Sequence, residues 1–373
     1  MKLDFCAPCL FGLEGPLADE MRRLNLENVR AENGRVRFSG TETDMARANI
    51  WLRCAERVMI ELGNFDARTF DQLFEGTKAL PWERFIPKDG TFPVTGHCLD
   101  SELHSVPDCQ KIIKKAVVER LKSVYSISWF PETGEQYRIR FAIMKDTAVL
   151  YLDTSGDGLH KRGYRPAHVA APLRETLAAA IVMLTKYRGK GDFCDPFCGS
   201  GTIPIEAALI AKNRAPGLKR GFSAEKWKCF DKNIWDEVRR EAASREFSNP
   251  YSIFGSDIDP EAVKMARENA ARAGVTDCVS FSVADACAFG RETERGIIAC
   301  NPPYGERIME KAECETLYSN FGRAVSGRPN WDMYVLSSHT EFERCFGRTA
   351  DKKRKLYNGM IKCELYMYRK GQK

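Results

Sequence analysis

An asparagine, two prolines and a tyrosine follow the apolar segment 296–300, as Asn301, Pro302, Pro303 and Tyr304. Consecutive prolines neither extend a sheet nor enter a helix interior, so the chain must turn at the end of a predicted strand. The Asn301 side chain offers an acceptor and a donor, and the rigid pair fixes where the Pro302 carbonyl points. With the Tyr304 ring, these groups can hold a flat conjugated amine, because two acceptors orient its hydrogens and the ring stacks on its face. The nitrogen is then aimed at an electrophile.

Three other polar segments follow predicted strands in the same part of the chain. The first runs from Asp195 to Thr202, and its Gly199 and Gly201 allow a sharp turn before a helix. This spacing is neither GxGxxG nor a P-loop, so phosphate binding is not favoured. Asp257 ends the next strand, where a carboxylate can accept both hydroxyls of a ribose, and Asp285 ends the third, where it can accept from an adenine amino group. Three such strand ends together indicate a nucleoside site.

The elements that position these residues alternate between helix and strand after residue 172. Strands are predicted at 192–196, 252–259, 279–285, 296–301 and 332–338, with helices between them and an irregular insertion at about 213–250. This rhythm predicts an α/β fold with a doubly wound parallel sheet. The last segment, 353–370, reads as a hairpin that adds an antiparallel strand. Asp259 before Pro260 is expected to cap a helix.

The first 150 residues show a different, α+β rhythm, in which pairs of strands and helices suit sheets covered on one face. A hairpin with an Asn33-Gly34 turn is predicted here, and Thr41 and Thr43 are candidate caps of the helix that follows. The predicted helix 107–125 carries four lysines near one face, which are either solvated or an RNA contact. These are Lys111, Lys114, Lys115 and Lys122.

Composition and charge exclude several classes of protein. Of the 373 residues, 43% are hydrophobic, which is ordinary for a globular protein. No apolar run is long enough to span a membrane, and the N-terminus does not resemble a signal peptide. We therefore expect a cytoplasmic protein. The net charge of +6 is mild, but the positive charge is concentrated in the part of the chain after residue 160. The modest positive field of that part favours polyanions without proving nucleic-acid binding. The fourteen cysteines are scattered through apolar segments, so we expect free thiols. The one CxxC, Cys6 to Cys9, has no second CxxC to complete a zinc site, so we expect no metal.

Taken in order, the segments DPFCGSGT, GSDIDP, VADA and NPPYGER resemble the motifs of class I S-adenosylmethionine-dependent methyltransferases that methylate amines. DTSGDGLHKRGYR, APLRETLAAA and NRAPGLKRGF resemble bacterial methyltransferases with a THUMP domain, which are relatives of the enzyme that makes N2-methylguanosine in 23S ribosomal RNA. The resemblance covers about 152–373 by motif and 1–150 by layout. It implies a ferredoxin-like segment at 1–65, a THUMP RNA-binding domain at 66–155 and a Rossmann-like class I methyltransferase domain at 156–373. Some relatives carry a second methyltransferase domain, and the sequence ends without one, so the target nucleotide need not be shared.

The same resemblance implies a role for each motif residue, with S-adenosylmethionine as the cofactor. Asn301, Pro302 and Tyr304 would be catalytic, and the substrate would also contact Pro303, Glu306 and Arg307. Arg307 could instead bind phosphate or pair with Glu306. The cofactor would be held by Asp195, Gly199, Ser200, Gly201 and Thr202 at its methionine part, by Asp257 at the ribose, by Asp285 at the adenine, and by Thr176, which lies in the stretch that closes over the methionine end.

The clamp chemistry is generic, so several targets remain open. Guanine N2, adenine N6 in RNA or DNA, and a glutamine side chain all offer a flat conjugated nitrogen. A separate α+β module followed by HKRGYR favours structured RNA, ribosomal or transfer, and no obligate protein partner is indicated. A cofactor-binding RNA assembly module that does not methylate is the alternative from another class, and the intact Asn301–Tyr304 segment argues against it. Cys300 is expected to pack inward rather than act as a nucleophile.

Overall fold

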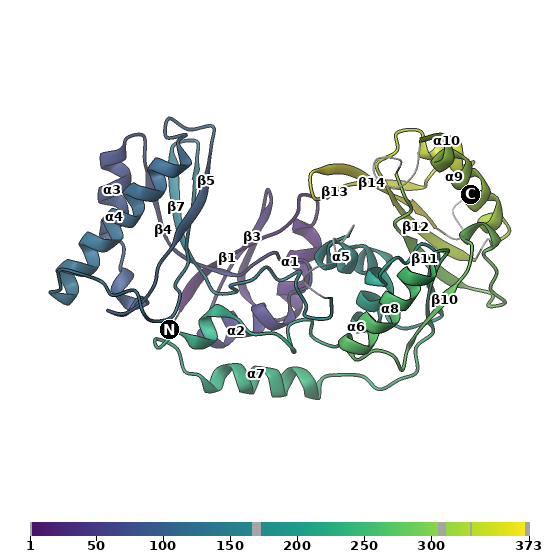
Figure 1. The fold of residues 1–373 in the computed structure, drawn as a ribbon, viewed down its shortest axis with the longest axis horizontal. Coiled ribbons are helices and arrows are strands. Elements are labelled where there is room, and N and C mark those ends of the chain that lie inside the picture. Colours follow the sequence, from purple (N-terminus) through teal and green to yellow (C-terminus); the bar gives the residue numbers. More distant parts are fainter. Residues whose placement is uncertain (1, 166–172, 305–310, 329, 370–373) are drawn as a thin grey trace.

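The computed structural model describes residues 2–165, 173–304, 311–328 and 330–369, and in this part of the chain the long strands form two sheets of seven strands each (Figure 1). Within the same residues, no helix combines the length and the apolar character needed to cross a membrane.

The first sheet and its helices are built, in chain order, from β1 (Leu3–Pro8), α1 (Glu14–Arg23), β2 (Glu27–Glu32), β3 (Arg35–Gly40), α2 (Glu42–Trp51), β4 (Met59–Asp66), α3 (Phe70–Ala79), β5 (Val94–Leu99), α4 (Val106–Tyr125), β6 (Ile139–Met144) and β7 (Thr147–Asp153).

The first sheet runs without a break through both predicted N-terminal units, in the order β2-β3-β1-β4-β7-β6-β5. Strand β4 joins them, because it pairs with β1 at Ile60 and with β7 along its length. An irregularity between Glu61 and Gly63 lets the strand change direction between its two partners. The predicted hairpin forms β2 and β3, and Thr41 caps α2 in a capping box with Asp44.

The second sheet has the order β10-β9-β8-β11-β12-β14-β13. Strands β8 to β12 are parallel, and β14 pairs antiparallel with β12, which confirms the predicted doubly wound fold with its terminal hairpin. Its elements are α5 (Glu175–Thr185), β8 (Asp192–Asp195), α6 (Thr202–Ala211), β9 (Ile253–Asp257), α8 (Pro260–Ala273), β10 (Val279–Val283), β11 (Gly296–Cys300), α9 (Lys311–Ser326), β12 (Trp331–Ser337), α10 (Phe342–Phe346), β13 (Lys352–Asn358) and β14 (Ile361–Tyr368).

The strand order reverses between β8 and β11. From β8 the chain moves outward through β9 to β10, and it then returns to place β11 on the other side of β8. In open α/β sheets, ligands bind outside the carboxyl ends of the strands at such a switch point. The carboxyl ends of β8 and β11 carry Asp195 and Asn301, so the two motifs with the richest chemistry meet there.

The insertion at 213–250 is more ordered than the sequence indicates, because it contains α7 (Asn233–Ser244). Figure 1 shows this helix lying along α2 of the N-terminal part. The Trp227 ring stacks on Tyr137 with centroids 4.9 Å apart, and Arg47 on α2 pairs with Glu241 on α7 at 3.3 Å. The insertion, which belongs to the C-terminal part of the chain, therefore packs against the N-terminal part and joins the two.

Candidate active site

The turn after β8 places a buried carboxylate beneath a glycine-rich loop. Asp195 is 2% exposed, and one of its oxygens accepts the Phe197 N–H at 3.0 Å. Burial, and the nearby charge of Asp257, raise the pKa of Asp195 well above its usual range. A carboxylate in such a place is short of a positively charged partner, and a cationic ligand would supply one.

The two glycines of this loop differ in what surrounds them. Gly199 has a φ of +49°, and a Cβ placed on it would meet no atom of the described residues within 4 Å, so this side of Gly199 is open among them. Gly201 has a φ of +83°, and a Cβ there would lie 3.0 Å from Ala266 and Phe281. Gly201 is thus needed for close packing of the loop against α8 and β10, whereas Gly199 leaves room for a ligand to approach the backbone.

Asp257 at the end of β9 is tied directly to this loop. Its Oδ2 accepts the Gly199 N–H at 2.8 Å, and its Oδ1 accepts the Asp259 N–H at 3.1 Å. Each carboxylate oxygen has a second lone pair, so Asp257 keeps the capacity to accept two hydroxyls. Asp259 caps α8 by accepting the Glu261 N–H, as predicted.

The neighbouring ends of β9 and β10 expose apolar side chains. Ile258, which follows β9, is 71% exposed, and Val283, the last residue of β10, is 54% exposed. Asp285, two residues beyond β10, accepts the Cys287 N–H at 2.8 Å with Oδ1. These two exposed aliphatic side chains and the Asp285 carboxylate lie at the ends of adjacent strands and offer apolar and acceptor groups to a ligand bound there. Sequence reasoning missed Ile258 and Val283, whose signal is an apolar residue next to an acidic one at a strand end.

The clamp residues lie at the carboxyl end of β11. Cys300 is fully buried, and burial, with the charge of Asp195, raises the pKa of its thiol well above the usual range, so it is an inert core residue as predicted. The Tyr304 hydroxyl donates to Oδ1 of Asn301, the oxygen that sequence analysis assigns to the amine. The Tyr304 hydroxyl therefore occupies the acceptor oxygen that an incoming amine would use.

A residue from α9 fixes the loop from behind. The Tyr318 hydroxyl donates to the Pro303 carbonyl oxygen at 2.5 Å, and Tyr318 is fully buried. Its ring packs edge-on against His339 and Phe342. Sequence reasoning missed Tyr318, because a tyrosine on the buried face of an amphipathic helix gives no signal beyond core packing.

Comparison with known proteins adds an independent line of support. Family models match residues 4–59 as an RlmL ferredoxin-like domain, 67–153 as a THUMP domain and 162–367 as an RMKL-like methyltransferase domain. The chain is 46% identical over 370 residues to the putative RNA methyltransferase YpsC of Bacillus subtilis, covering 98% of this chain and 96% of that protein. This chain belongs to the RMKL-like methyltransferase family. The prediction of a methyltransferase family that depends on S-adenosylmethionine, with a THUMP domain, is confirmed.

Other relatives of this methyltransferase differ in length and in the activity named for them. This chain is 36% identical to the ribosomal RNA large subunit methyltransferase K/L of Psychromonas ingrahamii, and the match covers 98% of this chain but 50% of that protein. A predicted N6-adenine-specific DNA methylase from Listeria monocytogenes superposes with a TM-score of 0.95 at 45% identity, covering 99% and 97% of the two chains. SMU.472, a putative methyltransferase complexed with SAH, superposes with a TM-score of 0.95 at 38% identity, covering 100% and 99%.

The structure brings most of the predicted site residues of this methyltransferase to one edge of the sheet. Asp195 and Asp257 end β8 and β9, and Asn301 directly follows β11, the neighbour of β8 on its other side. Ser200 is held through its carbonyl oxygen, which accepts from Asn269 Nδ2 at 2.9 Å, and Thr202 begins α6. Glu306 and Arg307 lie outside the described residues.

The Thr176 side chain is committed to another contact. Its hydroxyl donates to Oε1 of Glu56 at 2.7 Å, which links α5 to the N-terminal part. Burial alone would raise the pKa of Glu56, but its contacts with His160 and Thr176 and the nearby charge of Arg174 outweigh burial and lower that pKa. Thr176 therefore joins two parts of the chain, and its contact with the cofactor stays a prediction.

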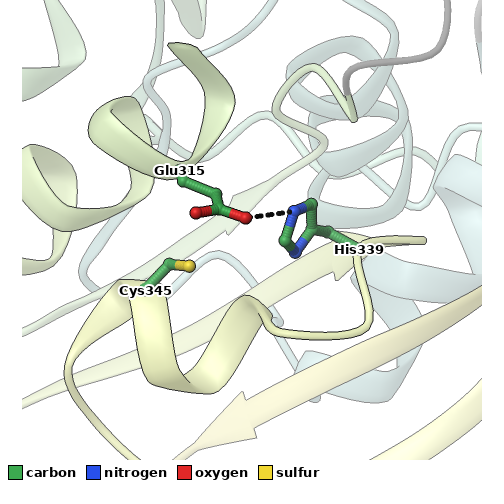
Figure 2. A group of neighbouring side chains, drawn as sticks. All are labelled: Glu315, His339 and Cys345. Atoms are coloured by element: carbon green, nitrogen blue, oxygen red, sulfur yellow. Dashed lines mark ion pairs between the residues drawn. The ribbon is translucent and has the colours of Figure 1, made fainter. Parts of the chain in front are cut away.

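Glu315, His339 and Cys345 form a cluster behind the clamp that has the residue types of a metal site (Figure 2). Its hydrogen bonds argue against one. His339 Nδ1 accepts the Glu341 N–H at 3.2 Å, so the ring proton sits on Nε2, which faces Glu315 at 3.4 Å. A metal-bound histidine normally carries its proton on the other nitrogen. Burial, with the charge of Glu315, also raises the pKa of the Cys345 thiol, so we assign the cluster to support of α9 and α10.

The lysine face of α4 is largely neutralised. Lys111 pairs with Asp108 at 3.4 Å, Lys114 with Glu132 at 2.6 Å and Lys122 with Glu119 at 3.4 Å. Lys114 also lies over the Phe92 ring at 3.6 Å. Of the two sequence interpretations, these contacts favour a solvated face over an RNA contact.

Proposed function

We propose that this protein transfers a methyl group from S-adenosylmethionine to the exocyclic N2 amine of a guanine in 23S ribosomal RNA. The observation that carries the proposal is the adjacency of two sites across the switch point of the sheet. The nucleoside site of Asp195, Gly199 and Asp257 adjoins the Asn301–Tyr304 clamp, because β8 and β11 are paired neighbours. A flat amine in the clamp would be held next to a ligand in the nucleoside site.

The residues present fit the cofactor. S-adenosylmethionine, when bound, supplies a methyl group activated by the positive charge on its sulfur. Asp195 would face the positively charged methionine end, the open side of Gly199 would admit it, and Asp257 would accept from the ribose hydroxyls. Ile258 and Val283 would lie against the adenine, with Asp285 at its edge.

The clamp would orient the amine rather than remove its proton beforehand. Asn301 Oδ1 and the Pro302 carbonyl accept the two N–H groups, which turns the nitrogen lone pair out of conjugation with the ring. Tyr304 releases Asn301 and stacks on the base, a contact worth about 1–3 kcal/mol. Tyr318 holds Pro303 in place throughout. The proton leaves to water during or after transfer, so no strong base is needed.

The choice of guanine and of 23S RNA is supported by the NPPYGER motif and by relatives named as large subunit ribosomal RNA methyltransferases. The chain spans about half the length of those relatives, so their target is a proposal for this chain. Adenine N6 is the second candidate, because the clamp is equally suited to it and the similar Listeria protein is described as a predicted N6-adenine-specific methylase.

Transcripts of 23S RNA made with inosine in place of guanosine separate the two candidates. Inosine lacks the N2 amine but leaves every adenine intact. Purified protein should transfer labelled methyl groups to the guanosine transcript and none to the inosine transcript. Equal labelling of both would instead support adenine, and labelling of neither, with intact cofactor binding, would support an RNA assembly module that does not methylate.

A further inference from the structure

A cavity of about 460 Å³ opens where α1, the end of α5 and the terminal hairpin meet, at the edge of the sheet away from the clamp. Figure 1 shows α1 beside α5, with β13 and β14 close by. Its floor is apolar and includes Met183, Leu184 and Met367. Its other lining is strongly basic. Six cationic side chains from α1, from β13 and from the segments that follow α5 and β14 line it: Arg23, Lys186, Arg188, Lys352, Arg354 and Arg369.

In the part of the chain that the structure describes, these charges are not neutralised by carboxylates. Asp19 is the acidic residue in the lining, and it pairs with Arg22 rather than with any of the six. Among the described residues, no ion pair joins the six cations to a carboxylate, and Arg354 donates to the Gly12 carbonyl instead. Burial and the nearby charge of Arg23 lower the pKa of Arg188. Like charges gathered in a concave site raise the free energy of the protein unless an anion enters.

A simpler explanation is that lysines on an edge strand prevent sheets from joining edge to edge. It accounts for part of β13, where Lys353 pairs with Glu343 at 2.8 Å. It does not account for Arg23, Lys186 and Arg188, which come from helix ends and not from the edge strand.

Strand β13 connects this cavity to the clamp. It begins at Lys352 in the cavity, passes the exposed Lys355, and ends at Asn358, whose side chain lies beside Tyr304. At about 3.3 Å per residue the strand spans roughly 20 Å, a distance that several nucleotides of RNA can cover. Near its end, the exposed Phe11 ring packs edge-on against Tyr357 with centroids 6.2 Å apart.

We propose that the basic cavity binds backbone phosphates of the substrate RNA, and that the RNA follows β13 from the cavity to the clamp. The inference rests on the proposed function for the identity of the polyanion. The cavity would then act in affinity and placement, with no part in the transfer step.

The test compares two triple variants of the full-length protein with equal changes in charge. K186Q/R188Q/K352Q removes three cavity charges, and K226Q/K232Q/R240Q removes three exposed charges from the insertion. Binding to an unmodified 23S transcript is measured without cofactor at several salt concentrations. The cavity variant should bind about 10–100-fold more weakly at 0.1 M salt, and its log–log salt slope should be shallower by about 2. The control should change by less than about threefold, and K186R/R188K/K352R should restore affinity.

Equal losses in both triple variants, or an unchanged salt slope in the cavity variant, would overturn the proposal. Tripolyphosphate serves as a probe for a free polyphosphate ligand. If the cavity variant loses tripolyphosphate binding but keeps its affinity for RNA, the cavity is a polyphosphate site and the proposal fails. Because binding is measured apart from transfer, an absence of N2-methylguanosine would overturn the proposed function and leave this result standing.

Discussion

The Gly199 backbone N–H donates to Asp257 Oδ2 at 2.8 Å, so the glycine-rich loop after β8 is fixed by the carboxylate that ends β9. One acidic residue thereby holds the shape of the loop and keeps lone pairs for a ribose. The two predicted halves of the nucleoside site are therefore mechanically coupled, and a change at Asp257 should disturb the loop as well as the ligand.

Gly199→Ala and Gly201→Ala should separate ligand access from packing. At Gly199 the φ of +49° costs an alanine about 1–2 kcal/mol, and its methyl group enters the open space above the loop. Gly199→Ala should weaken S-adenosylmethionine binding at least tenfold with a modest loss of stability. Gly201→Ala should mainly lower stability, because its Cβ meets Ala266 and Phe281 at 3.0 Å. Calorimetric binding and thermal unfolding of both variants check this, and the reverse pattern would contradict it.

Asp195→Asn should stabilise the protein without cofactor while weakening cofactor binding. Burial raises the pKa of Asp195 above its ordinary value of 3.8, so the folded state keeps a proton that the unfolded state loses as pH rises. The contribution of Asp195 to stability therefore falls as pH rises from about 4 through the raised pKa. Asp195→Asn should remove this slope and unfold at a higher temperature at neutral pH.

Thermal unfolding of the cofactor-free protein across pH 4 to 8 measures the effect of Asp195→Asn, with the exposed Asp66→Asn as control. The difference in unfolding temperature between Asp195→Asn and the unsubstituted protein should grow with pH. A difference that is constant across this range, or that shrinks as pH rises, would refute the assignment.

Tyr318→Phe should slow transfer without changing cofactor binding. It removes the hydrogen bond to the Pro303 carbonyl, which costs about 0.5–1.5 kcal/mol of stability. Because a small displacement of a positioning group can cost about 100-fold in rate, kcat should fall about 10–100-fold. Tyr368→Phe is the matched control, since its buried hydroxyl donates to the Arg348 carbonyl at 3.2 Å, away from the clamp. Equal loss of kcat in both variants would show that Tyr318 acts only through stability.

Much of the fold was predictable because its signals are local. Alternating strands and helices predicted the doubly wound sheet, and the helix expected between the strands at 296–301 and 332–338 is α9. The continuity of the first sheet was not predictable, since the pairing of β4 with both β1 and β7 is a long-range contact. In the same way, α7 in the insertion is stabilised by packing on α2, and its sequence alone indicates only an irregular segment.

The site shows the same division between local and distant signals. Asn301 and Asp257 could be placed at strand ends because a motif follows each strand directly. Tyr318 and Asn269 could not, because they reach the site from helices α9 and α8 through tertiary contacts. Thr176 was assigned by resemblance to the cofactor, yet its hydroxyl bonds to Glu56, a partner 120 residues away in the sequence.

Asn301→Ala tests the clamp directly. Loss of the side-chain acceptor removes one of two contacts that orient the amine, and it also frees the Tyr304 hydroxyl. Transfer should fall by at least about 100-fold while the affinity for S-adenosylmethionine changes by less than about twofold. Comparable losses in transfer and in cofactor affinity would place Asn301 in the nucleoside site instead.

Mass spectrometry of nucleosides from 23S RNA tests the transfer of methyl groups to guanine N2 in cells. The RNA is taken from a strain that lacks this gene and from the same strain complemented either with the unsubstituted gene or with Asn301→Ala. N2-methylguanosine should fall in the deletion strain, return with the unsubstituted gene, and stay low with Asn301→Ala. Loss of N6-methyladenosine with N2-methylguanosine unchanged would contradict the proposed transfer to guanine N2.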